Sequence, residues 1–283
     1  MAEPDEYFRC TYTVNPYRGC QHDCQYCYVQ AKKYLPSENR EDFSQKIQIK
    51  TTAPFLLKKA LEKIKPGGLI CLGSATDPYQ PIEEKYQITR HLLEIIFSFC
   101  YPAQIITKSP LIRRDIRLIK ENSKKSFCTV SLSLISLNPR LVKIFEPMAP
   151  SPQSRLETVQ ELARAGISVG ITLMPILPYL TEGGDLEKVF YAAKSAGATY
   201  VLPGALTLRD NVQQRFFSLL HQHYPQLLHR YSALYDRGIN PSITFLQRIN
   251  QELAHLSQKY KLPLSFPCEP EKIFPYPRQG EFW

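Results

Sequence analysis

The 283-residue sequence has no long apolar run and no export signal. No hydrophobic stretch reaches the roughly 18 residues that suggest a membrane span, so we expect no membrane partner. The first ten residues, MAEPDEYFRC, are polar and acidic, without the basic start and apolar core of a signal peptide. We therefore expect the protein to be cytoplasmic, in a compartment that keeps thiols reduced.

Repeats and nucleotide-binding glycines are also missing. The chain contains no short-period repeat, no low-complexity tract and no G-x-G-x-x-G segment of the kind that binds dinucleotides. Acidic residues are in the minority, because 35 Lys and Arg oppose 26 Asp and Glu for a net charge of +9. This excess weakly favours a polyanionic partner such as nucleic acid, and a basic surface without such a partner is an equal alternative.

What recurs along the chain is a unit of amphipathic helix, glycine stop and short apolar strand. The helix predicted over 53–64, for example, ends at a Pro-Gly-Gly stop before an apolar strand. Further helices are expected over 84–99 and 110–121, and after the N-cap candidates Ser151 and Asp185. We predict strands over 11–17, 69–73, 103–108, 126–135, 167–174 and 199–204.

Short apolar strands that alternate with helices predict a parallel sheet in an α/β fold. Six such units suggest an open or partial (β/α)6 TIM-like barrel, because the full barrel needs more units than the sequence offers. After the last strand the sequence predicts helices, most clearly over 211–223 and 241–260. We therefore expect a barrel domain over 1–205 and a C-terminal helical extension over 206–283. Its proline-rich tail would cover the barrel in extended form, with Pro263, Pro267, Pro270, Pro275 and Pro277.

Three of the eight cysteines lie close together in the spacing C-x3-C-x2-C, at Cys20, Cys24 and Cys27. Three thiolates on one compact loop can hold three irons of a cubane cluster and leave the fourth iron open for chemistry. Gly19 would let the backbone come close to such a cluster.

The alternative for the same cysteines is a zinc site. Cys24 and Cys27 have the spacing of a zinc knuckle, and Cys20, His22 or Cys10 could complete the ligand set. Such sites normally bring a second ligand pair, and no C-x2-C or H-x3-H pair follows, which favours the cluster. The remaining cysteines are scattered, as small core residues are.

The cysteine triad with the trailing Tyr28 resembles the radical S-adenosylmethionine (radical SAM) superfamily. The resemblance implies a [4Fe–4S] cluster, a partial (β/α)6 barrel, and S-adenosylmethionine chelated to the fourth iron. It also implies that Tyr28 lies near the adenine, and that a one-electron reductant such as flavodoxin or ferredoxin is a partner.

Further blocks are similar to the spore photoproduct lyase-like branch of that superfamily. They are SATDPYQPIE at 74–83, Thr107-Lys108-Ser109, Phe145-Glu146-Pro147, and Ala149-Pro150-Ser151 with Arg155. Together these blocks extend the resemblance over roughly residues 12–205.

Polar residues at the ends of the predicted strands are the candidate cosubstrate ligands, because sites on such barrels lie at the carboxyl ends of the strands. The candidates are Ser74, Thr76, Asp77, Lys108, Ser131 and Ser133. Many superfamily members bind the ammonium through a Gly-Gly-Glu that is missing here, so Asp77 or nearby backbone carbonyls are expected instead. The resemblance assigns the carboxylate to Lys108, and Ser131 or Ser133 could bond the ribose. Ordinary structural roles are the alternative for each.

The resemblance implies that a reduced cluster cleaves S-adenosylmethionine and that the 5′-deoxyadenosyl radical takes a hydrogen atom from the substrate. Lyases of the branch act on thymine dimers in DNA, and repair of nucleic acid is the first hypothesis. A peptide or small-molecule substrate is the second, and a zinc- or cluster-stabilised nucleic-acid-binding module without catalysis is the third. Ser74 stands where the lyases carry a hydrogen-donating cysteine, so Tyr79 and Cys71 are the candidate donors.

Overall fold

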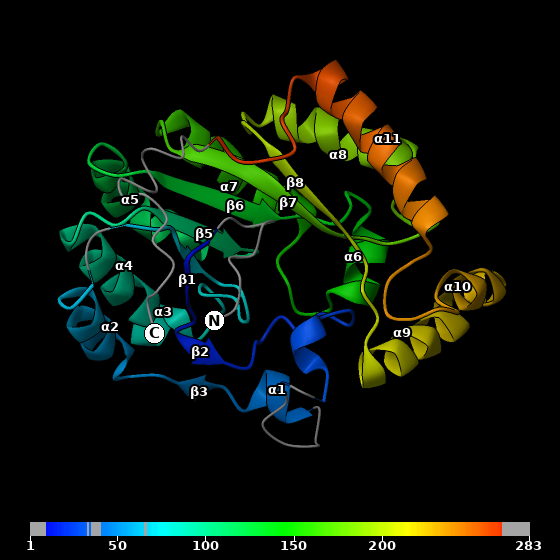
Figure 1. Cartoon of the computed structure of the whole chain (residues 1–283), viewed down its shortest axis with the longest axis horizontal. Coiled ribbons are helices and arrows are strands. Elements are labelled where there is room, and N and C mark those ends of the chain that lie inside the picture. Colours follow the sequence, from blue (N-terminus) through cyan, green and yellow to red (C-terminus); the bar gives the residue numbers. More distant parts are fainter. Residues whose placement is uncertain (1–9, 33, 35–40, 65–66, 268–283) are drawn as a thin grey trace.

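A single open sheet of six parallel strands organises the chain, whose computed structural model describes residues 10–32, 34, 41–64 and 67–267 (Figure 1). The strand order is β1-β4-β5-β6-β7-β8, and every pairing is parallel. The strands are β1 (Tyr12–Val14), β4 (Ile70–Leu72), β5 (Ala103–Thr107), β6 (Cys128–Ser133), β7 (Ser168–Ile176) and β8 (Val201–Ala205). The predicted α/β fold with a partial, unclosed six-unit barrel is confirmed.

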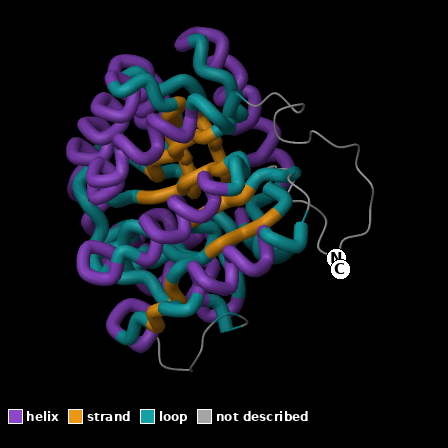
Figure 2. Tube along the Cα trace, turned by 90° about the vertical axis from the view of Figure 1, so that its left-hand side faces the viewer, coloured by secondary structure: helices purple, strands orange, loops and turns teal. Residues whose placement is uncertain are grey.

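The strands read as apolar runs because both faces of the sheet are covered. Successive side chains of a strand point to opposite faces. Ile105, Val130 and Ile171 belong to the large core that the strands share with the helices. Cys71 and Tyr200 belong to a smaller core that is separate from it. Figure 2 shows the strands enclosed by helices and loops.

Helices follow the strands where the sequence predicts them. They are α2 (Ala53–Leu61), α3 (Glu83–Tyr86), α4 (Ile88–Ser98), a 3-10 turn (Pro110–Asp115), α5 (Ile116–Ser123), α7 (Pro152–Arg164) and α8 (Gly184–Ser195). A left-handed residue, Gln87, divides the helix expected over 84–99 into α3 and α4. Ser151 caps α7 by accepting a hydrogen bond from the Ser154 N–H, as expected. Asp185 does not cap α8, because it lies inside the helix and its carboxylate accepts from the Ser136 hydroxyl.

Several short elements carry no periodic sequence signal. The strands β2 (Tyr17–Arg18) and β3 (Gln48–Ile49) form a small antiparallel ribbon. It lies next to the loop that carries Cys20, Cys24 and Cys27, called the cysteine loop below. The others are α1 (Glu41–Gln45), α6 (Pro139–Phe145), α10 (Leu228–Leu234) and 3-10 turns at Tyr28–Gln30 and Pro225–Leu227. In the part of the chain that is described, no helix combines the length and apolarity needed to cross a bilayer.

The C-terminal part packs directly onto the barrel. Helix α11 (Ile243–Tyr260) lies along α8, and α9 (Asp210–His223) contacts the 3-10 turn after the third cysteine (Figure 1). Beyond α11, the Val201 N–H donates to the carbonyl of Pro263, so this segment runs beside β8. Pro270, Pro275 and Pro277 lie outside the described residues. Because Phe216 and Tyr231 share the large core with the strands, a boundary after residue 205 stays a prediction.

Candidate cluster-binding site

A cavity of about 290 Å³ opens at the carboxyl ends of the strands. On one side it is lined by the loop that carries Cys20, Cys24 and Cys27. On the other side it is lined by residues that follow or end β4 to β8, among them Asp77, Lys108, Ser133, Met174 and Thr207. The parallel strands all end at this edge, so residues far apart in sequence meet there.

The loop leaves β2 through Gly19, which has a left-handed φ of 91°. A Cβ atom on Gly19 would lie 2.6 Å from the backbone oxygen of Phe43, so only glycine fits. The Cys20 N–H donates to that same oxygen at 2.9 Å. Gly19 therefore allows the loop to lie close to the backbone of α1, and its approach to a cluster stays a prediction.

Cys24 is buried, and Cys20 and Cys27 are partly buried. Burial raises the pKa of the Cys20 thiol to about 12, and the nearby Asp77 carboxylate adds to this rise. Burial likewise raises the pKa values of Cys24 and Cys27. A metal or cluster that bound here would have to displace three protons, because the thiolate is the ligand form.

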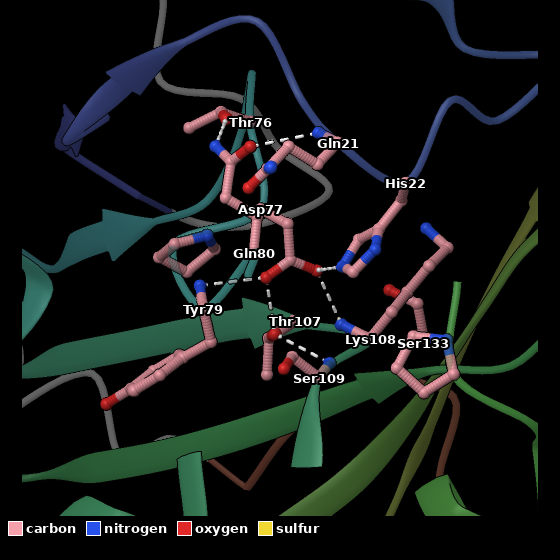
Figure 3. A network of polar contacts seen from close by, with 12 residues as sticks. Gln21, His22, Thr76, Asp77, Tyr79, Gln80, Thr107, Lys108, Ser109 and Ser133 are labelled. Atoms are coloured by element: carbon pink, nitrogen blue, oxygen red, sulfur yellow. Dashed lines mark hydrogen bonds and ion pairs between the residues drawn. The ribbon is translucent and has the colours of Figure 1, made fainter. Parts of the chain in front are cut away.

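Asp77 joins the cysteine loop to the end of β5 (Figure 3). Its Oδ1 accepts from the Thr107 hydroxyl (2.6 Å) and the Tyr79 N–H (2.9 Å), and its Oδ2 accepts from the Lys108 N–H (2.7 Å). His22 Nε2, from the loop, lies 3.1 Å from Oδ2. Burial alone would raise the pKa of Asp77, but His22, Thr107 and the Lys108 N–H outweigh it and lower the pKa to about 2.

Thr76 and Ser74 hold the loop from the same segment. The Thr76 hydroxyl donates to the carbonyl of Gly19 at 2.6 Å. Ser74 accepts from the Asn15 side chain (3.0 Å) through its hydroxyl, and from the Tyr28 phenol (2.5 Å) through its carbonyl. The Tyr28 side chain is thereby oriented at the cavity although 46% of its surface is exposed.

A second buried carboxylate, Glu146, lies on the other side of the loop. It accepts hydrogen bonds from the Tyr26 phenol and from Arg155, and the Lys108 ammonium lies 3.8 Å away. The Gln25 N–H donates to the carbonyl of Phe145 at 2.8 Å. Burial alone would lower the pKa of Lys108, but Cys24 and Glu146 outweigh it, so the pKa is raised and the ammonium stays charged.

Nine of the twelve residues predicted from sequence line the cavity: Cys20, Cys24, Cys27, Tyr28, Ser74, Thr76, Asp77, Lys108 and Ser133. Ser131, Cys71 and Tyr79 are not among the lining residues. Ser131 is fully buried against the Tyr200 hydroxyl at 2.8 Å, and Cys71 packs in the small core. Tyr79 is fully buried and its phenol donates to Asp115 at 3.1 Å.

Sequence reasoning missed the residues that fix the loop from a distance. In the sequence Glu146 and Arg155 carry only a family resemblance, and it is the fold that pairs them in a fully buried ion pair. Arg215 and Asn211 on α9 also contact the loop, from about 190 residues away in the chain. No local pattern marks them, whereas Thr107, which also lines the cavity, is the last residue of β5 and belongs to a block already noted in the sequence.

An open parallel sheet with three cysteines near its carboxyl edge places the chain in the α/β class, with its cavity where sites of such folds lie. Residues 14–215 match the family model described as the radical SAM superfamily. The chain belongs to that superfamily, and its fold is that of a radical SAM enzyme.

Its similar proteins are largely uncharacterized. The chain is 33% identical over 254 residues to an uncharacterized protein of Mycobacterium tuberculosis, covering 89% of this chain and 75% of that one. It is 25% identical over 192 residues to the radical SAM Nalpha-GlyT isomerase of Pseudomonas phage M6, covering 67% of this chain and 38% of that one.

Solved structures show the same fold. A spore photoproduct lyase complexed with dinucleoside spore photoproduct aligns with a TM-score of 0.67 at 15% identity, over 91% of this chain and 77% of that one. Streptococcus suis SuiB bound to its precursor peptide SuiA aligns with a TM-score of 0.56 at 12% identity, over 92% of this chain and 49% of that one.

Proposed function

We propose that Cys20, Cys24 and Cys27 hold a [4Fe–4S] cluster on which S-adenosylmethionine binds. The observation that carries this proposal is that three cysteines, one buried and two partly buried, and Lys108 line one cavity at the carboxyl edge of a radical SAM sheet. When bound, the reduced cluster supplies the electron that splits S-adenosylmethionine and yields a 5′-deoxyadenosyl radical that abstracts a substrate hydrogen. A one-electron reductant such as flavodoxin or ferredoxin is the proposed partner.

The arrangement of the thiols fits a cluster better than one zinc ion. A single zinc ion needs its ligands to converge within about 2.0–2.3 Å of one point. Among the described residues, no group of three His, Cys, Asp or Glu side chains is arranged to hold one ion. A cubane takes one thiolate on each of three irons, so its three sulfur ligands line a cavity without converging.

Three side chains are proposed to orient the cosubstrate. Lys108, kept charged beside Glu146, would pair with its carboxylate, and Ser133 at the end of β6 would bond its ribose. Tyr28, fixed through Ser74, would lie at the adenine. The Asp77 carboxylate already has four partners, so backbone carbonyls of the same segment are the better candidates for the ammonium.

For the substrate, nucleic acid is the proposal that the comparisons favour. The net charge of +9 suits a polyanion, and the fold resembles a lyase solved with a dinucleoside lesion at a higher TM-score than a protein solved with a peptide. Cys71 and Tyr79 are not among the residues that line the cavity, so neither is proposed as the hydrogen donor.

Anaerobic reconstitution with iron and sulfide tests the cluster. We expect a brown protein with a broad absorbance shoulder that cleaves S-adenosylmethionine to 5′-deoxyadenosine under strong reductant. Cys24→Ala should lose both properties, and the exposed Cys100→Ala should keep them. A fully active Cys24→Ala enzyme would refute the site. The substrate class is tested by titrating DNA at several salt concentrations, since phosphate contacts give a steep salt dependence. DNA that neither binds nor changes cleavage would exclude nucleic acid.

A further inference from the structure

Helix α9 is hydrogen-bonded to the cysteine loop through the guanidinium of Arg215. Nε and Nη2 of Arg215 donate to the carbonyl of Gln25 at 3.0 and 2.9 Å, and Nη1 donates to Gln30 Oε1 at 2.7 Å. Gln30 is fully buried and passes the contact on, because its amide donates to the carbonyl of Cys24 at 2.9 Å. One side chain therefore fixes two successive carbonyls between the second and third cysteines.

Asn211, one turn earlier on α9, holds the end of the same loop. Its Nδ2 donates to the carbonyl of Gln30 at 2.9 Å, and its Oδ1 accepts from the Lys32 N–H at 3.1 Å. Together, Asn211 and Arg215 satisfy backbone groups that would otherwise have to find water or strain the loop.

Arg215 also places a fixed positive charge against the cysteine loop. Its guanidinium donates to the carbonyl of Gln25, which lies between Cys24 and Cys27 in the chain. A guanidinium stays protonated throughout the usable pH range and donates in a rigid fork. Thiolate ligands bring negative charge into a buried site, and Arg215 is positioned to offset it.

We propose that Arg215 is a positioning residue of the cluster site, and that α9 is therefore a part of that site rather than a cover added to it. This inference rests on the proposed function, because it assigns Arg215 to a cluster on the three cysteines. Arg215 has two separable effects. Its fork fixes the backbone on which Cys24 and Cys27 are spaced, and its charge favours the reduced form of the cluster.

Two substitutions separate geometry from charge. Arg215→Gln removes both the fork and the charge, whereas Arg215→Lys keeps the charge and loses the fork. Arg237→Gln is the matched control, because Arg237 lies in the same C-terminal part with a 95% exposed side chain. Asn211→Ala is a milder variant that removes two of the hydrogen bonds.

The first readout needs no cluster. Hydrogen exchange of the backbone over residues 25–32 is followed in the cluster-free chain, and it should be several-fold faster in Arg215→Gln than in wild type or Arg237→Gln. The second is iron release from the reconstituted protein to a chelator, which should be roughly 10–100-fold faster in Arg215→Gln. The third is the midpoint potential, which should become more negative in Arg215→Gln and stay near wild type in Arg215→Lys.

The outcomes distinguish the two proposals. If wild type takes up no cluster while exchange is still faster in Arg215→Gln, the proposed function fails. Only the claim that Arg215 holds the backbone of the cysteine loop is then supported. If wild type holds a cluster and Arg215→Gln matches it in exchange, iron release and potential, this inference is overturned. If Arg215→Gln does not fold, Arg215→Lys and Asn211→Ala decide by the same readouts.

Discussion

Replacing Glu146 by glutamine should destabilise the chain without changing its shape. The side chains of Glu146 and Arg155 are both fully buried, and no solvent can take over from a lost partner. Removing one member of such a pair costs about 3–5 kcal/mol, because the other charge is left buried and uncompensated. Arg155 keeps its bonds to the carbonyls of Ser133 (2.9 Å) and Pro150 (2.9 and 2.7 Å), so the low end applies.

A loss of about 3 kcal/mol lowers the Tm of a chain of this size by roughly 6–12 °C. The assay is thermal and urea unfolding of the cluster-free protein, which removes any contribution from a bound group. Glu157→Gln is the control, because its carboxylate is 51% exposed and pairs only loosely with Arg113 at 3.9 Å. It should stay within about 0.5 kcal/mol of wild type.

The double variant Glu146→Gln with Arg155→Met completes a thermodynamic cycle. It removes both charges, so it should be less destabilised than the sum of the two single variants. The pKa of Glu146 is lowered although burial opposes this, because Arg155 and Lys108 favour its charged form. Its contribution is therefore present at neutral pH and is lost as the pH falls. A cost below about 1 kcal/mol, or additive single variants, would refute the reasoning.

Three further outcomes follow from single residues. The pKa of Asp77 is lowered to about 2, so its contribution is complete above pH ~4 and lost as the pH falls further. The stability gap between wild type and Asp77→Asn in urea should therefore shrink by roughly 2 kcal/mol on acidification. Gly170→Ala should cost about 1–3 kcal/mol in the same assay, because its Cβ would lie 2.3 Å from the buried Tyr200 ring. Gly184→Ala, with open space around it, should be neutral. Ser74→Ala should keep cleavage of S-adenosylmethionine and lose about 1 kcal/mol, because Tyr28 bonds the backbone of Ser74 and only the Asn15 contact is lost.

The fold was predictable because its signals are local. Buried parallel strands are continuous apolar runs, and glycine or proline interrupts the chain between strand and helix. The ribbon of β2 and β3 gave no such signal, because each strand has two residues and its partner lies about 30 residues away. The left-handed Gln87 was equally hidden, since glutamine carries no preference for that conformation.

The sequence could place candidate site residues near strand ends, but it could not tell which of them reach the cavity. Ser131 and Ser133 are two residues apart and share a face, so sequence alone could not rank them. The structure separates them, because Tyr200, just before β8, covers Ser131 and leaves Ser133 at the cavity. Cys71 likewise lies in the small core and not at the cavity, although it is only two residues before the cavity-lining Gly73. Whether a strand residue reaches the cavity depends on which side chains of neighbouring strands cover it, and a single sequence does not contain that tertiary information.

The blocks shared with the spore photoproduct lyase-like branch have a common structural purpose. Asp77, in the block at 74–83, fixes the loop through His22, and Glu146, in the block at 145–147, fixes it through Tyr26. Both carboxylates contact the loop that carries the cysteines, and the oxygens of both already have partners within the protein. The blocks therefore carry information about how the cysteine loop is positioned. Substitutions that alter substrate choice should be sought among cavity residues outside these blocks, such as Thr172 within β7 and Thr207 after β8.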